Sequence, residues 1–217
     1  MRSEVLIRSY EPRDRSAVRV ICCETADRGG PIERVLSDRE VVADFLTRYY
    51  TDYEPAASWV AEQEGRVIGY LTGSLDSRRY WRVTRWRIGP AVTIHALRRG
   101  MLWRWETWRL LCAALITCWR GGFSRYVPLD RYPTHLHVNV RQGYRAQHVG
   151  RRLLERFVAQ VKDAGRRGIH ASVREDNAPA CRLFERMGFA VLSRHPVTLP
   201  DETGFRAYHT VIYGKTL

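Results

Sequence analysis

Two short segments of the chain carry residues that could do chemistry, and the first is a loop that enters a helix. In Gly143–Phe157 (GYRAQHVGRRLLERF), a turn-like segment leads to Gly150 and then directly into apolar positions at helical spacing. Such a loop presents unpaired N–H groups, and the helix dipole adds to their attraction for an anion. Arg145, Arg151 and Arg152 could bracket a diphosphate there. The segment lacks both GxGxxG and GxxxxGK(S/T), so neither a Rossmann dinucleotide site nor a P-loop is predicted.

A predicted strand with two histidines precedes this loop. The strand is predicted at Leu136–Val140. His135, His137 and Asn139 alternate with Leu136, Val138 and Val140, so the three polar side chains share one face. Histidine titrates near neutral pH, so His137 or His135 is the candidate catalytic base, with Asn139 beside it, if this face meets the substrate. The alternative is that both are half-buried histidines whose rings bond to the backbone. No third ligand lies nearby, so no metal site is predicted.

The second segment, Asn177–Phe189 (NAPACRLFERMGF), begins a short helix after a predicted strand at Ile169–Val173. Asn177 can cap that helix, and Pro179 suits its first turn. Together, the two segments resemble the signatures of the GNAT acyltransferase family. The family's loop, Q/R-x-x-G-x-G/A, corresponds to Arg145-Ala146-Gln147-His148-Val149-Gly150, and its second motif, N-x-x-A-x-x-x-Y-E-x-x-G-F, corresponds to Asn177, Ala180, Phe184, Glu185, Gly188 and Phe189.

The resemblance implies an N-acetyltransferase that uses acetyl-CoA as cosubstrate, without a metal, by direct attack of an amine on the thioester. It implies that backbone N–H groups of residues 147–152 hold the pyrophosphate and that pantetheine lies along Val138–Val140 like an added strand. A backbone N–H near Val140 would polarise the thioester carbonyl, and Asn177 would bond the pantetheine. The residues expected at the cofactor are Val138, Val140, Arg145, Ala146, Gln147, His148, Val149, Gly150, Arg151, Arg152, Asn177, Ala180 and Phe184.

Two residues depart from the family pattern. Phe184 stands where the family often has a tyrosine that protonates the leaving thiolate, and a phenylalanine has no proton to give. An alternative function is therefore an acetyl-CoA-binding module with weak or no turnover. His148 stands where the family has glycine; if the position needs a positive φ, histidine is strained there, although its backbone N–H can still donate. Glu24, Asp27 and Glu33 are weak candidates to bind the amine, and solvated surface acids are their alternative interpretation.

The elements that must position these residues follow from the apolar pattern. Strands are predicted at Val5–Ile7, Ser58–Gln63, Arg66–Ser74, Phe189–Ser193 and Ala207–Tyr213, and helices at Pro12–Thr25, Asp38–Tyr49 and Val149–Ala164. With 217 residues and 45% hydrophobic content, the chain suits one domain, 1–217. The predicted fold class is α/β (α+β): a mixed, mostly antiparallel sheet flanked by helices. The close resemblance to the GNAT family covers the acetyl-CoA-binding core at 134–189.

A helical basic insertion at 76–131, between the third and fourth strands, differs in composition from the rest. Residues 78–125 hold eleven arginines and one acid, Glu106, and the insertion holds six of the seven tryptophans. This charge implies an acidic partner, or arginines on the solvated faces of helices. Three interpretations stay open: a helical wall that packs on the domain beside the acceptor site, a membrane-surface contact, and a nucleic-acid contact. The helical spacing of Leu102, Trp105, Trp108, Cys112, Leu115 and Trp119 favours the first.

The five cysteines are odd in number and form no CxxC, so reduced thiols in the cytoplasm are expected. No signal peptide is predicted from the first residues, and no apolar run is long enough for a membrane span. The strand lead-in YPTHLHVNV and the basic insertion also resemble a subgroup related to the acetyltransferase-like domain of O-GlcNAcases. The acceptor amine and the oligomeric state are left open.

Overall fold

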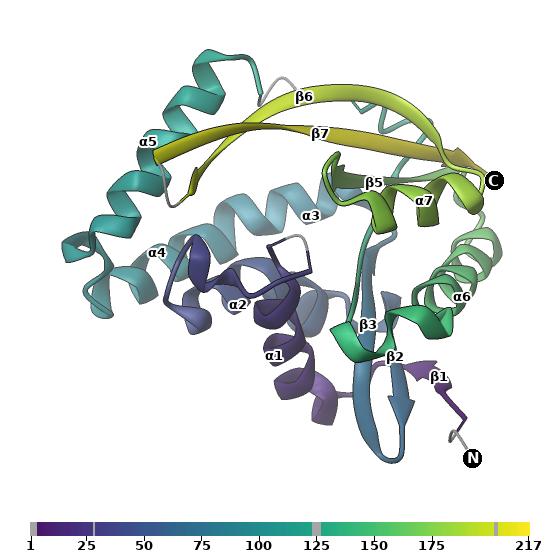
Figure 1. Cartoon of the computed structure of the whole chain (residues 1–217). Helices are drawn as coiled ribbons and strands as arrows, with labels where there is room; N and C mark the ends of the chain where they lie inside the picture. Colours follow the sequence, from purple (N-terminus) through teal and green to yellow (C-terminus); the bar gives the residue numbers. More distant parts are fainter. Residues whose placement is uncertain (1–3, 28, 123–126, 202–203) are drawn as a thin grey trace.

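The computed structural model describes residues 4–27, 29–122, 127–201 and 204–217, without the side chains of residues 34, 145 and 146. A seven-stranded sheet with the order β1-β2-β3-β4-β5-β7-β6 forms its centre (Figure 1). Every neighbouring pair is antiparallel except β4 and β5, so the predicted mixed, mostly antiparallel sheet is confirmed. The strands are β1 (Leu6–Ser9), β2 (Ser58–Gln63), β3 (Arg66–Ser74), β4 (Thr134–Val140), β5 (Gly168–Arg174), β6 (Ala190–Asp201) and β7 (Gly204–Thr216).

Four helices flank this sheet near the positions that the sequence predicts: α1 (Arg15–Thr25), α2 (Arg39–Arg48), α6 (Val149–Asp163) and α7 (Ala178–Arg186). Their starts follow from capping. The Asp38 carboxylate accepts from the Val41 amide at 3.2 Å and begins α2. The Asn177 side chain accepts from the Ala180 amide at 3.4 Å and begins α7, as expected.

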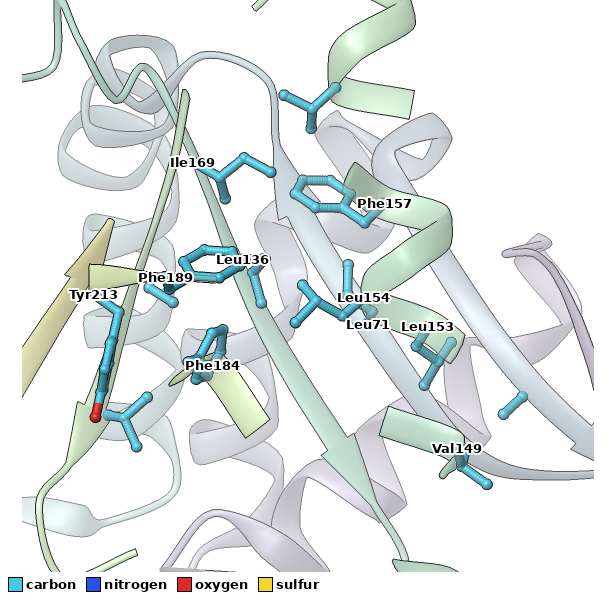
Figure 2. Packing of buried hydrophobic residues seen from close by; sticks show 14 of the residues in the cluster. Leu71, Leu136, Val149, Leu153, Leu154, Phe157, Ile169, Phe184, Phe189 and Tyr213 are labelled. Atoms are coloured by element: carbon cyan, nitrogen blue, oxygen red, sulfur yellow. The ribbon is translucent and has the colours of Figure 1, made fainter. Parts of the chain in front are cut away.

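The main core lies between the sheet and α6 (Figure 2). The apolar face of α6 is buried, as the sequence predicts, and it packs on Leu71 of β3, Leu136 of β4 and Ile169 of β5. Gly73 makes the close approach of helix and strand feasible, because a Cβ there would lie 2.3 Å from the Phe157 ring. This packing fixes α6 against β4, which carries His135 and His137, and against β5 beside it.

The insertion between β3 and β4 consists of α3 (Ser77–Val83), a π turn (Thr84–Ile88), α4 (Gly89–Arg98), a 3-10 turn (Met101–Trp103) and α5 (Trp105–Trp119). Its first half packs on the domain, as predicted. Ile88, Val92 and Met101 join Val41 of α2 and the buried Tyr50 in a second core. This half of the insertion is therefore part of the fold that surrounds the central strands.

The amphipathic side of α5, whose spacing favoured a wall that packs on the domain, does not pack on it. The residues at that spacing, Leu102, Trp105, Trp108, Cys112, Leu115 and Trp119, are all exposed. Small residues face the protein instead, since Ala113 and Thr117 are buried where α5 rests on β6. The Thr117 hydroxyl accepts from the Thr198 amide at 2.9 Å, and a short side chain permits that approach. Among the described helices, none combines the length and the apolar run needed to span a bilayer.

Candidate active site

The gap between β4 and β5 opens a cavity at the centre of the sheet. The two parallel strands pair only at Thr134 with Ile169 and at His135 with His170, and they separate beyond these pairs. The start of α6 and the outer side of α7 border the gap, which holds a cavity of about 420 Å³. Its lining comes from β4 (Val138, Asn139, Val140), the start of α6 (His148, Gly150, Arg151), α7 with its cap (Asn177, Pro179, Ala180, Arg182, Leu183, Arg186, Met187), and Thr25 and Gly29.

The first turn of α6 faces this cavity. His148 precedes the helix with φ 54° and ψ 17°, so this position does take the left-handed conformation that glycine adopts most readily. The first amides of a helix have no partner within it, and here they belong to Val149, Gly150 and Arg151. The Val149 side chain itself is buried in the core. The loop residues 142–147 form a 3-10 turn, and the side chains of residues 145 and 146 are outside the described part of the structure.

The structure places Arg152 away from the predicted diphosphate site. Its N–H donates to the His148 carbonyl at 3.1 Å, so this amide is committed to the helix. Its side chain lines a separate hollow beside β1, with Glu4 and Glu155. Gln147 is half-buried and does not line the cavity. Arg151 does line it, and its guanidinium donates to Glu155 at 2.7 Å.

Sequence reasoning missed two cations at the cavity, Arg182 and Arg186 of α7. They lie four residues apart, so they project from one side of the helix. The signal was present in NAPACRLFERMGF, because positions 179, 182, 183 and 186 form one helical stripe. With Arg151, these side chains make the cavity strongly attractive to an anion.

A second cavity of about 320 Å³ adjoins the first on the side of α1 and α2. Six residues line both cavities, so the two are joined: Thr25, Gly29, Val138, Asn139, Asn177 and Ala180. The second cavity is further lined by Cys22, Ala26, Phe45, Leu46, Tyr70, Thr72, Tyr80, Leu136, His137, Ala171, Ser172, Val173, Arg174 and Phe184. We call it the acceptor pocket. Tyr80 comes from α3, so the first half of the insertion supplies part of this wall.

The two histidines of β4 have different surroundings, although they share the predicted face. His135 is buried, with the Tyr50 hydroxyl 2.9 Å from Nε2 and the Ser77 hydroxyl 2.8 Å from Nδ1. Burial holds its pKa well below the usual 6.5. Its partners are side-chain hydroxyls rather than the backbone expected for a structural histidine.

The exposed side chain of His137 lines the acceptor pocket, and its ring has no hydrogen-bond partner among the described residues. Neighbouring side chains displace part of the water around the ring, and this desolvation, with a smaller contribution from His170, lowers its pKa to about 4. The ring is therefore neutral at neutral pH. A neutral imidazole has a free lone pair, although a weakly basic one.

Asn139 lies where the two cavities join, and Phe184 lines the acceptor pocket. Asn139 donates to the Tyr70 hydroxyl at 2.7 Å, which fixes the amide beside the strand backbone. Phe184 is buried, with its ring centroid 5.2 Å from that of Phe189 and 5.7 Å from that of Tyr213. The Tyr213 hydroxyl donates to Glu185 at 2.9 Å, so it is committed there.

The three acidic candidates are ion-paired outside the acceptor pocket. Glu24 accepts from Arg141 at 2.9 Å, Asp27 from Arg174 at 3.0 Å, and Glu33 lies 3.2 Å from Arg39. Asp27 is buried, which differs from the solvated position expected as the alternative. Among the described residues that line the acceptor pocket there is no carboxylate.

Comparisons with known proteins agree with this architecture. The family model for the acetyltransferase (GNAT) family matches residues 97–189. The structure of SsHAT is 25% identical and superposes with a TM-score of 0.70 over 98% of both chains. At the level of fold, yncA, a putative acetyltransferase from Salmonella typhimurium with its cofactor acetyl-CoA, has 16% identity and a TM-score of 0.58 over 98% of this chain and 94% of its own. Drosophila melanogaster polyamine N acetyltransferase has 18% identity and a TM-score of 0.57 over 99% of this chain and 100% of its own.

The fold is that of the GNAT acetyltransferases. The match over residues 97–189 includes both signature segments, and together with the fold it supports the GNAT acetyltransferase family for this chain.

Proposed function

We propose that this protein is an acetyl-CoA-dependent N-acetyltransferase of the GNAT family. The observation that carries the proposal is the joined pair of cavities: one faces the start of α6 and the arginines of α7, and the other contains His137. A cosubstrate with a phosphorylated end and a reactive thioester end needs such a pair. The acetyl-CoA named in the yncA structure supports the same cosubstrate here.

In this proposal, the amides of Val149, Gly150 and Arg151 hold the pyrophosphate, and Arg182 and Arg186 add positive charge for the phosphates. Pantetheine lies along residues 138–140 of β4, in the gap that β5 leaves. The Asn177 oxygen caps α7, which leaves its NH₂ group for the pantetheine. Binding of this kind fixes the thioester at the junction of the two cavities.

The transfer itself is a direct attack of a neutral amine on the thioester carbonyl. A C–N bond forms, the C–S bond breaks, and the electron pair leaves on the CoA sulfur as thiolate. The amine proton passes to His137, directly or through water, because its neutral ring lies in the acceptor pocket. A backbone N–H near Val140 stabilises the developing oxyanion. Phe184 supplies no proton, so the thiolate leaves unassisted by that position.

The pocket favours an acceptor amine that is already neutral. Aliphatic amines carry a positive charge at neutral pH, as lysine does near pKa 10.4, and no carboxylate among the described pocket residues would pair with that charge. Phe45, Leu46 and Tyr80 offer apolar and aromatic surface for the body of the acceptor. We therefore propose an amine of low basicity on an apolar or aromatic body, such as an arylamine.

Two measurements test this function. Titration of acetyl-CoA by calorimetry should give a binding heat, and no heat and no thermal shift at millimolar ligand would reject the proposal. Thiol release should then be faster with an arylamine than with an aliphatic diamine at equal concentration. The reverse order would reject the neutral-amine assignment and leave the cosubstrate intact.

A second candidate function is an acetyl-CoA-binding module without turnover. Phe184 favours it because this side chain cannot protonate the leaving thiolate. Binding heat with no thiol release across arylamines, aliphatic amines and amino sugars would favour it. The resemblance to the acetyltransferase-like domain of O-GlcNAcases stays a prediction.

A further inference from the structure

A continuous apolar face on the outside of α5 has no part in the proposed chemistry. It is made by seven residues that we call the tryptophan face: Leu102, Trp103, Trp105, Trp108, Leu111, Leu115 and Trp119. Trp103 is 91% exposed and Trp119 87% exposed. At about 1.5 Å per residue, the helical part from Trp105 to Trp119 is roughly 21 Å long. Apolar surface of this extent marks an interaction site more often than a chance exposure.

The tryptophan face is not what attaches α5 to the protein. The opposite side does so, through Ala113 and through Thr117, which bonds Thr198 of β6. Arg109 also points inward, where its guanidinium donates to the carbonyl oxygens of Asp201 and Gly204 at the β6–β7 end. The helix is therefore held with its apolar side outward, as a surface contact would require. Figure 1 shows α5 at the periphery of the molecule, beside β6 and β7.

The segment that carries the face is strongly basic. Residues 78–125 carry a net charge of +10. Glu106, the one acid of this segment, accepts from the hydroxyl of the exposed Ser37. Arg98 at the end of α4 and Arg120 just after α5 are exposed and have no acidic partner among the described residues.

We infer that the tryptophan face docks on an anionic phospholipid surface, with α5 lying in the plane of the headgroups. Tryptophan and leucine partition into that boundary layer, and arginines beside them attract lipid phosphates. In this surface association, the positive charge of residues 78–125 complements the negative charge of the bilayer.

Two other occupants fit the surface less well. A second copy of this chain would bring two segments of net charge +10 together, and their repulsion opposes such a dimer. Single-stranded nucleic acid is held by cations interleaved with stacking rings. Arg109, the only arginine within α5, points away from the tryptophan face. Leu102, Leu111 and Leu115 offer neither charge nor a hydrogen bond to a phosphate backbone.

Vesicle flotation tests the inference with the full chain. Vesicles of phosphatidylcholine alone are compared with vesicles containing about one quarter phosphatidylglycerol, at low and at physiological salt. We expect flotation with the anionic vesicles, weaker flotation at higher salt, and a blue shift of the tryptophan emission. Arg98→Gln and Arg120→Gln should each lower binding roughly fivefold.

A matched pair of double variants locates the contact. Trp105→Ser with Leu115→Ser removes two members of the face and should reduce binding at least about tenfold. Leu6→Ser with Val20→Ser removes two exposed apolar side chains elsewhere and should leave binding unchanged. Equal binding of both variants would overturn the inference. The inference would also be overturned if the wild-type chain did not bind anionic vesicles at low salt. This holds whether the chain instead shifts a single-stranded oligonucleotide or forms dimers through the face.

Discussion

The hydroxyl of Tyr50 lies 2.9 Å from Nε2 of His135, and this contact separates the two histidines of β4 into different roles. With Ser77 at Nδ1, both ring nitrogens of His135 are occupied inside the second core. His137, two residues along the same strand face, opens instead into the acceptor pocket. One strand therefore contributes a structural histidine and a chemically available one.

Replacing each histidine should separate these roles. His137→Ala should lower kcat/KM about 100-fold, the low end for a lost general base, and change the melting temperature little. His135→Ala removes the ring that bonds the hydroxyls of Tyr50 and Ser77 and leaves a cavity in a buried site, so it should cost about 3 kcal/mol of stability. Thiol-release kinetics and urea unfolding measure the two effects. Equal loss of activity in both variants at matched folding would contradict the assignment of His137.

Restoring a hydroxyl at position 184 should increase turnover. Phe184 borders the acceptor pocket, so Phe184→Tyr places a proton donor near the leaving thiolate and should raise kcat up to about tenfold. Phe184→Leu is the control, because it keeps an apolar side chain without a hydroxyl. If the tyrosine and leucine variants release thiol at the same rate, departure of the thiolate does not limit the reaction.

Neighbouring arginines of α6 should differ in their effect on acetyl-CoA. Arg151 lines the cavity at the α6 start, whereas Arg152 faces the hollow beside β1. Arg151→Gln should weaken acetyl-CoA binding roughly fivefold, as expected for one lost partly exposed phosphate contact. Arg152→Gln should change it less than about twofold. Calorimetric titration of both variants decides, and a larger loss in Arg152→Gln would show that the pyrophosphate binds elsewhere.

Stability should fall as the solution becomes acidic. The folded protein lowers the pKa of His135, His137 and His170 through desolvation, that of His137 to about 4, whereas the unfolded chain titrates near 6.5. Between these values the unfolded state binds more protons, so this contribution is complete above pH 6.5 and is lost as the pH falls toward 4.

Urea unfolding across this range measures that pH dependence. His137→Gln should reduce the slope of the unfolding free energy against pH. An identical slope in wild type and His137→Gln would contradict the description of His137 as a desolvated, neutral ring.

The sheet and the helix starts were predictable because local chemistry specifies them. Glu64-Gly65 joins β2 to β3 with bounds that match the prediction, and Asn177 caps α7 where the motif placed it. The common face of His135 and His137 likewise follows from strand alternation. Their different roles did not, because Tyr50 and Ser77 are far from β4 in the sequence.

The orientation of α5 could not be predicted from periodicity. The pattern of Trp105, Trp108 and Trp119 shows that the helix has an apolar side, but not which side meets the protein. That choice came from Ala113 and Thr117, whose small side chains let the helix approach β6. Arg182 and Arg186 were missed for a related reason, because charges on a helix are assigned to solvent unless a cavity is known to lie beside them.

The second core has a consequence for how the molecule unfolds. Ile88 and Val92 of the insertion share that core with Val41 of α2 and with Tyr50, which in turn holds His135. Opening α4 therefore exposes α2 and releases the strand that carries the histidines. Amide hydrogen exchange should protect α2 and α4 as one cooperative unit, so this insertion cannot be excised as an independent module.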